Sequence, residues 1–276
     1  MAATPELLSA RDHYTRQQII ANRGLKEAQR IARTKPELLA GAIATYQVAS
    51  SVEAINSFLP ILAEQGIEAS PIAQVLPTAL AGYSSAGVPL EIVVRDLVRK
   101  AAVPATMWVF ERFVLTQLLD VSRQATSAMM AVTEETNGYY RQLVGPSCGR
   151  CVVLAGKFFS KNAGFQRHPR CNCRHIPSHS DLKADWSLDP IEYFNSLTKK
   201  EQAATFTKHG AELIKAANSH RDQQYALGRV MNTRWGVRTS QAIDTKWRKL
   251  PETLVWMADG NQKLLLEMMK SYGYIR

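Results

Sequence analysis

Four cysteines are the residues whose type and spacing most directly indicate chemistry. They form two close pairs, Cys148-Gly-Arg-Cys151 and, after a 19-residue spacer, Cys171-Asn-Cys173. Two pairs of sulfur ligands suit the tetrahedral coordination of a structural Zn²⁺. Neighbouring arginines, Arg150 among them, favour the thiolate form that binds metal. We therefore predict one structural zinc ion held by these four cysteines.

The second pair is unusually short, and histidines flank it at His168 and His175. Either histidine can replace a sulfur ligand, and His168 is the preferred substitute. The competing interpretations are two disulfides, buried thiols without a metal, and a redox Cys-x-x-Cys. The N-terminus shows no secretory signal, which argues against disulfides. A catalytic zinc is disfavoured because residues 141–180 contain no Asp or Glu to act as a general base.

Basic residues are concentrated in the second half of the chain. The net charge of +10 divides into −1 over residues 1–140 and +11 over residues 141–276. Two blocks, 141–180 and 229–249, suit a polyanion such as nucleic acid, although a solvated surface has the same composition. Nothing resembles a base-reading set, so we predict binding of double-stranded DNA without sequence preference. The candidate contacts are Arg150, Lys157, Arg167, Arg170, Arg174, Arg229, Arg234 and Arg238.

The first half is predicted to form helices that carry protein contacts rather than chemistry. Thr4-Pro5-Glu6 has the pattern of a helix start. Apolar residues recur every three or four positions from Phe110, which predicts a long helix from about Pro104 to Val132, with Asn137-Gly138 as its furthest stop. No uninterrupted apolar stretch approaches the roughly 20 residues of a membrane span. We therefore expect no membrane contact and synthesis in a cytoplasm.

The fold class predicted for the whole chain is mainly α, in three parts. Residues 1–138 form a helical interaction domain. Residues 139–180 form a zinc-knuckle-like Cys/His module, whose spacer has room for one short hairpin. Residues 181–276 form a basic helical region, in which Thr198 and Glu201 make a capping box, 229–249 is an irregular basic arm, and Pro251 opens the first of two closing helices.

The cysteine motif resembles the Mu F-like minor head proteins of tailed bacteriophages. The likeness is carried by Tyr139-Tyr140, by Val144 to Phe158 with its Cys-x-x-Cys, and by Phe165 to Cys173 with its His-Pro-x-Cys-x-Cys. The stretches Asp189 to Gln202 and Asn232 to Thr239 are similar to the version found in phages of actinobacteria. The similarity covers about residues 135–276, and the first 130 residues match only in helical character.

This resemblance implies a minor capsid protein for head morphogenesis, made in the host bacterial cytoplasm and located inside the head near the portal. Its expected partners are the portal protein, packaged double-stranded DNA, and the major capsid or a scaffolding protein. Some relatives are labelled capsid maturation proteases, so an enzyme, either such a protease or a zinc-containing nuclease, is the alternative. The residues reveal no paired nucleophile and base, so we expect no catalysis. A transcriptional DNA binder is a third interpretation.

Overall fold

The structure is a computed structural model that describes residues 7–143, 149–161, 173–180, 190–217, 219–235 and 248–276. It describes only the backbone of Arg150, of residues 228–235 and of Glu252. The described residues are mainly helical and include one small antiparallel sheet, in agreement with the predicted fold class. The helices of the first half are α1 (Leu8–Thr34), α2 (Leu39–Ala63), α3 (Leu90–Ala101) and α4 (Met107–Ala131). Short 3-10 turns at Pro36–Leu38, Pro77–Leu80 and Pro104–Thr106 lie between them.

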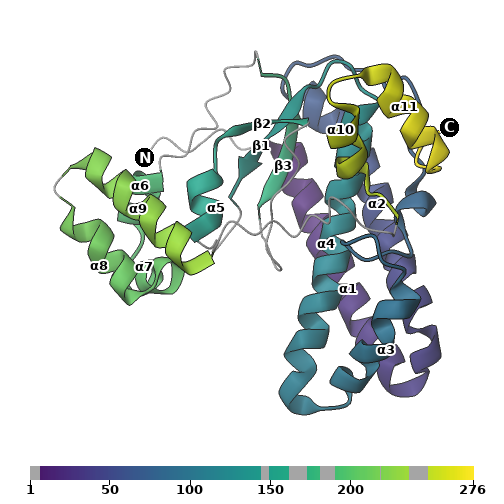
Figure 1. Ribbon diagram of the computed structural model, residues 1–276, viewed down its shortest axis with the longest axis horizontal. Coiled ribbons are helices and arrows are strands. Elements are labelled where there is room, and N and C mark those ends of the chain that lie inside the picture. Colours follow the sequence, from purple (N-terminus) through teal and green to yellow (C-terminus); the bar gives the residue numbers. More distant parts are fainter. Residues whose placement is uncertain (1–6, 144–148, 162–172, 181–189, 218, 236–247) are drawn as a thin grey trace.

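Helices α1, α2 and α4 lie side by side and form the body of the molecule (Figure 1). In the lower part of this body the three helices share an apolar core with α3. That core includes Ile43, Leu97 and Phe110. Small residues on α1 allow close approach: a Cβ added at Gly24 would lie 2.5 Å from Leu118 Cδ1. The long helix predicted from about Pro104 to Val132 is confirmed as Met107–Ala131, after a 3-10 turn at Pro104–Thr106. The furthest stop at Asn137-Gly138 is wrong, because Gly138 begins a strand.

The first two helices are also joined by polar contacts. Glu53 of α2 accepts hydrogen bonds from Arg16 Nε at 2.6 Å and Ser57 Oγ at 2.8 Å, and it lies 3.5 Å from His13 Nδ1. Burial raises the pKa of Glu53, but these hydrogen bonds outweigh it and lower that pKa to about 2. Glu64, at the end of α2, accepts from the backbone N–H groups of Leu8 and Ser9, which satisfies donors at the first turn of α1. The predicted start at Thr4-Pro5-Glu6 lies outside the described residues.

By length and composition alone, the stretch Pro36–Ala63 is apolar enough to cross a membrane. In the structure its helix, α2, packs against α1 and α4. Ile43, Phe58 and Leu62 are buried in the two clusters that those contacts make. This packing buries one side of α2, whereas Leu38, Val52 and Leu59 are exposed.

The sheet has the strand order β2-β1-β3, from β1 (Gly138–Gln142), β2 (Phe158–Ser160) and β3 (Arg174–Ser178). Both neighbours pair antiparallel with β1. A strand therefore does form in the spacer between the cysteine pairs, and it pairs with β1; residues 162–170, the part of the spacer in which a second strand of a hairpin would follow, lie outside the described residues. A Cβ at Gly138 would lie 2.2 Å from the Phe159 carbonyl oxygen, so this close pairing requires glycine.

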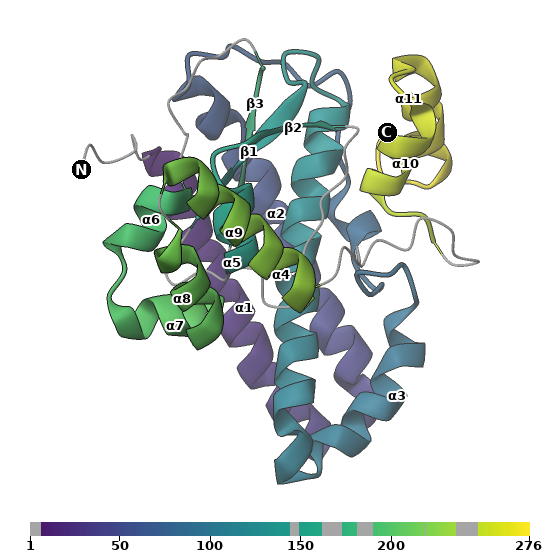
Figure 2. The ribbon, with the colours of Figure 1, turned by 60° about the vertical axis from the view of Figure 1, so that its left-hand side comes forward.

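A separate group of short helices has its own small core. It comprises α5 (Gly149–Leu154), α6 (Pro190–Ser196), α7 (Lys199–Phe206), α8 (Lys208–Ala216) and α9 (His220–Trp235). Phe194 and Phe206 meet edge to face at 5.3 Å within a cluster that includes Val152 of α5. The capping box of α7 is confirmed, because Thr198 Oγ1 accepts from Glu201 N and Thr198 N donates to the Glu201 carboxylate. Figure 2 shows this helical lobe in front of α1.

The predicted irregular arm at 229–249 is wrong for its first part, because α9 continues to Trp235. The physical reason lies upstream. Ser219 Oγ accepts from Asp222 N at the start of the helix, and Ala226 and Leu227 are buried against the lobe core. With a capped start and a packed face, the helix extends into a sequence that has little apolar periodicity of its own. Residues 236–247 lie outside the described residues.

The closing helices, α10 (Pro251–Ala258) and α11 (Gln262–Ser271), are confirmed, and they pack on α4. Val75 and Ile275 form an antiparallel bridge, and Tyr274 is buried in the upper core. Arg248 fixes this arrangement: its Nη2 donates to the carbonyls of Ala79 and Tyr272, and its guanidinium lies 4.5 Å from the Tyr274 ring centroid. One arginine of the predicted DNA-binding block is therefore part of the core structure.

Candidate metal centre and basic surface

The pairing of β1 with β3 brings the two cysteine motifs to one end of the sheet. In this antiparallel register Gln142, the last residue of β1, is opposite Arg174, the first residue of β3. The first cysteine pair follows β1 after a short connection, and Cys173 directly precedes β3. The connections that carry the two cysteine pairs are more than twenty residues apart in the sequence. They nevertheless join the sheet at neighbouring residues, Gln142 and Arg174.

The two cysteines that the structure describes are both buried. Cys151, on α5, is 1% exposed, Cys173 is 3% exposed, and both belong to the core cluster around the end of α4. Within the described part of the chain no group of three or more His, Cys, Asp or Glu is placed to hold a metal ion. Cys148, Cys171 and His168 lie outside the described residues. The zinc site with four ligands therefore stays a prediction. Two of its predicted ligands, Cys151 and Cys173, lie in the same buried cluster.

Two arginines from different elements hold Cys173. Arg141 of β1, itself 2% exposed, donates from Nη2 to Cys173 Sγ at 3.5 Å. Arg123 of α4 donates from Nη2 to the Cys173 carbonyl oxygen at 3.2 Å and pairs through Nη1 with Asp120 at 2.8 Å. A guanidinium beside a sulfur stabilises negative charge there, which is the form that a metal requires. The long helix of the body thus fixes the position of the second cysteine motif.

His175, the other histidine beside the cysteines, lies on β3 and is 7% exposed. Its ring stacks on Tyr139 with centroids 4.3 Å apart, and Tyr139 stacks in turn on Phe159 at 5.6 Å. The sheet thus carries a stack of three rings beside the cysteines.

The sequence analysis did not single out Arg123 or Asp120. Both residues lie outside the apolar stripe that begins at Phe110, so only the fold shows that they are buried. Charged residues at core positions are almost always paired, and these two pair with each other.

The predicted DNA contacts are only partly described. Lys157 is exposed, whereas Arg174 is half-buried with its guanidinium 5.1 Å from the Tyr14 ring centroid. Arg150 lies in α5, and Arg229 and Arg234 lie in α9, with only their backbones described. Arg167, Arg170 and Arg238 lie outside the described residues.

The basic block 141–180 is not a uniform solvated surface. Of its described basic residues, Arg141 is buried, and Arg174 and Lys161 are half-buried. Burial lowers the pKa of Lys161, and the charge of Glu134 partly opposes this. Among the basic residues of this block whose side chains are described, Lys157 alone is exposed, so part of the block's charge serves the module itself.

Comparison of the chain with protein-family models, with curated proteins and with solved structures finds no match.

Proposed function

We propose that this chain is a Mu F-like minor head protein of a tailed phage, with a structural role inside the capsid near the portal. The observation that supports this best is the position of the two cysteine motifs, which carry the resemblance. The β1–β3 register places their flanking residues opposite each other, and the two described cysteines are buried in one cluster. The burial of Cys151 and Cys173, one from each pair, in the same cluster supports this assignment more than scattered cysteines would.

The proposal includes one structural zinc ion. Cys151 and Cys173 are buried sulfurs of the type that zinc prefers, and the Arg141 guanidinium beside Cys173 favours its thiolate. Cys148 and Cys171 would complete the set, with His168 as the substitute ligand. The metal would supply a cross-link that joins α5 to the start of β3. No catalytic step is assigned to it.

Zinc content and portal capture together test this function. Purified chain should contain one zinc per molecule by elemental analysis, and Cys151→Ser should lose it. Because the module lacks a large core of its own, this variant should also lose near-UV signal from the sheet while most far-UV helical signal remains. A metal-free wild-type chain with an intact module would contradict the zinc assignment.

The proposed portal contact lies on the helical body. A deletion of residues 1–100 would not test the portal contact alone, because it would also remove the core that α1, α2 and α3 share with α4. Exposed apolar residues on α3, on its connection to α4 and on α4 are better targets: Ile92, Val103 and Trp108 are each 45% exposed or more. Replacing all three by Ser should abolish capture by immobilised portal protein and incorporation into heads. Leu213→Ser, an equally exposed apolar residue of the lobe, is the control.

The proposed DNA contact uses phosphates rather than bases. The support is the charge of +11 over residues 141–276, with Lys157 and the lobe lysines Lys199, Lys200 and Lys208 exposed. The logarithm of the binding constant should fall with the logarithm of salt concentration, by about 0.9 for each phosphate neutralised. Reversing the charge of Arg229, Arg234 and Arg238 should flatten that slope for two unrelated duplexes alike.

Arg99→Glu, an exposed charge reversal in the first half, is the control for this titration and should leave the slope unchanged. Strong preference for one duplex, or affinity that is indifferent to salt, would contradict the proposal and favour a sequence-specific DNA binder.

A further inference from the structure

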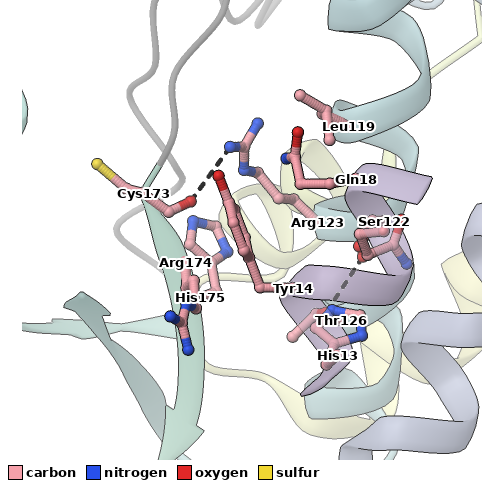
Figure 3. A pocket seen from close by; sticks show the side chains of 11 residues that line it. His13, Tyr14, Gln18, Leu119, Ser122, Arg123, Thr126, Cys173, Arg174 and His175 are labelled. Carbon is pink, nitrogen blue, oxygen red and sulfur yellow. Dashed lines mark hydrogen bonds between the residues drawn. The ribbon is translucent and has the colours of Figure 1, made fainter. Parts of the chain in front are cut away.

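The small pocket behind Cys173 serves the cysteine motif (Figure 3). It lies between α1, α4 and β3, and its Arg123 donates to the Cys173 carbonyl oxygen and pairs with Asp120. The outer face of α2 is different, because its residues are exposed and take no part in the cysteine module or in the proposed portal contact.

Every exposed residue of α2 is uncharged. Six of these residues form what we call the α2 seam: Thr45, Ala49, Val52, Asn56, Leu59 and Ala63. They are spaced four, three, four, three and four positions apart, which is the 3.5-residue repeat of a helix that packs lengthwise on another helix. By contrast, α1 and α3 expose charged residues such as Arg23 and Arg95. A long exposed face without charge is typical of a surface that a partner covers.

The seam has both protruding side chains and a hollow. Val52 is 38% exposed and Leu59 39% exposed, and Leu38, in the turn before α2, is 51% exposed. Leu59 and Ala63 also line a hollow of about 450 Å³, together with Gly66, Ile67, Glu68 and Ala69. Helices pack by placing the ridges of one into the grooves of the other, so this relief suits a second helix.

The charges at the two ends of the seam are complementary. Residues 33–38 have a net charge of +1, and residues 64–69 have a net charge of −2. Lys35 and Glu68 are exposed, and neither forms an ion pair within the part of the chain that the structure describes. Leu38 lies fourteen residues before Val52, and Gly66 of the hollow lies fourteen residues after it. The two ends are therefore placed symmetrically about Val52.

We propose that two copies of this chain associate through the α2 seam, antiparallel, with a twofold axis near Val52. In such an isologous contact the same face of both copies meets, so an uncharged centre brings no like charges together. Leu38 of each copy then enters the hollow of the other, and Lys35 of each copy approaches Glu68 of the other. Asn56, the one amide of the seam, favours a single register.

This inference goes beyond the proposed function and does not depend on it. The dimer contact uses none of the residues assigned to the portal, which are Ile92, Val103 and Trp108. Loss of portal capture would therefore leave the dimer in place, and loss of the dimer would not by itself prevent capture.

Sedimentation equilibrium of the full-length chain tests the dimer. A contact along one helix face is at the small end of specific interfaces, so we expect a Kd of roughly 10 µM and a rise from one chain to two between about 1 and 200 µM. Val52→Lys places two like charges at the axis and should weaken association at least ~10-fold. Leu213→Lys, a 49% exposed residue of the lobe, is the matched control and should dimerise normally. Both variants should keep the wild-type far-UV circular dichroism spectrum.

A charge swap tests the antiparallel arrangement. Lys35→Glu should weaken the dimer roughly fivefold, because two exposed pairs are lost and like charges replace them. Adding Glu68→Lys to the same chain should restore the dimer, because the swapped charges pair again. A double variant that is no stronger than Lys35→Glu would overturn the antiparallel arrangement.

Two other results would overturn the dimer itself. One is a chain that stays monomeric over the whole concentration range. The other is a Val52→Lys variant that dimerises as well as Leu213→Lys, which would place the contact elsewhere. Vesicles of neutral phosphatidylcholine test the other occupant of an uncharged face: a monomeric chain that sediments with them, and no longer does so as Val52→Lys, would assign the seam to lipid instead.

Discussion

Replacing Arg123 by Met should destabilise the protein far more than removing an exposed arginine does. The side chains of Arg123 and Asp120 are only 10% and 5% exposed, and their charged atoms are 2.8 Å apart. Removing one partner of a buried pair typically costs about 3–5 kcal/mol, because the other charge stays in a poorly solvated site. The lost hydrogen bond to the Cys173 carbonyl adds about 1 kcal/mol. We therefore expect a loss of roughly 4–6 kcal/mol in the free energy of unfolding.

Urea unfolding followed by far-UV circular dichroism measures this loss. Arg99→Met is the matched control, because Arg99 and Asp96 have the same three-residue spacing but lie 3.8 Å apart with side chains 82% and 75% exposed. Exposed pairs of this kind contribute about 0–1 kcal/mol. The double variant Asp120→Asn with Arg123→Met should recover part of the stability, since the unmatched charge is gone.

The reasoning is refuted if Arg123→Met and Arg99→Met unfold at the same urea concentration. A second measurement probes the link to the cysteine motif. Loss of the Arg123 hydrogen bond should free the segment before β3, so Cys173 should react faster with a maleimide reagent in Arg123→Met than in the wild-type chain. No change in that rate would mean that the carbonyl contact does not position the cysteine.

Three further predictions follow from other parts of the fold. Glu53, whose pKa is about 2 because its hydrogen bonds outweigh burial, should contribute about 3 kcal/mol that is present above pH 4.5 and lost as the pH falls towards 2; acid titration of Glu53→Gln should show a smaller loss over this range. Gly138→Ala should disrupt the sheet, because the new Cβ would lie 2.2 Å from the Phe159 carbonyl oxygen, and faster amide exchange in β1 and β2 would report it. Thr198→Ala should cost about 1 kcal/mol through the lost cap of α7, measured by urea unfolding.

The helices were predictable because their signals are local. Pro251 and the capping box at Thr198 act within one turn of the chain, and the stripe from Phe110 reports a single buried face. The sheet was not predictable in the same way, because β1 finds both partners at positions that only the tertiary fold brings near. A strand in the spacer was foreseen, but its pairing depended on Gly138, twenty residues earlier.

The same distinction between local signals and tertiary contacts applies to the candidate site. Paired spacing identified the cysteines, whereas the roles of Arg141 and Arg123 depend on burial, which composition does not reveal. The basic blocks show the limit most clearly, since both were assigned to DNA contact and the sequence does not separate such contacts from charges that serve the fold. In the structure Arg141 contacts Cys173 and Arg248 fixes Tyr274, so both charges serve the fold itself.

The strand-like contact between residues 74–76 and 274–276 has a consequence for how the protein is made. Gln74 and Arg276 are hydrogen-bonded partners 202 positions apart. At a synthesis rate of roughly 5–20 residues per second, the upper core waits on the order of 10 to 40 s for its last members. During that interval Phe58, Leu80 and Val121 lack the apolar cover that Tyr274 and Ile275 later provide. Newly made chains should therefore depend on chaperones, and chains cut short before α10 should be degraded or aggregate rather than accumulate.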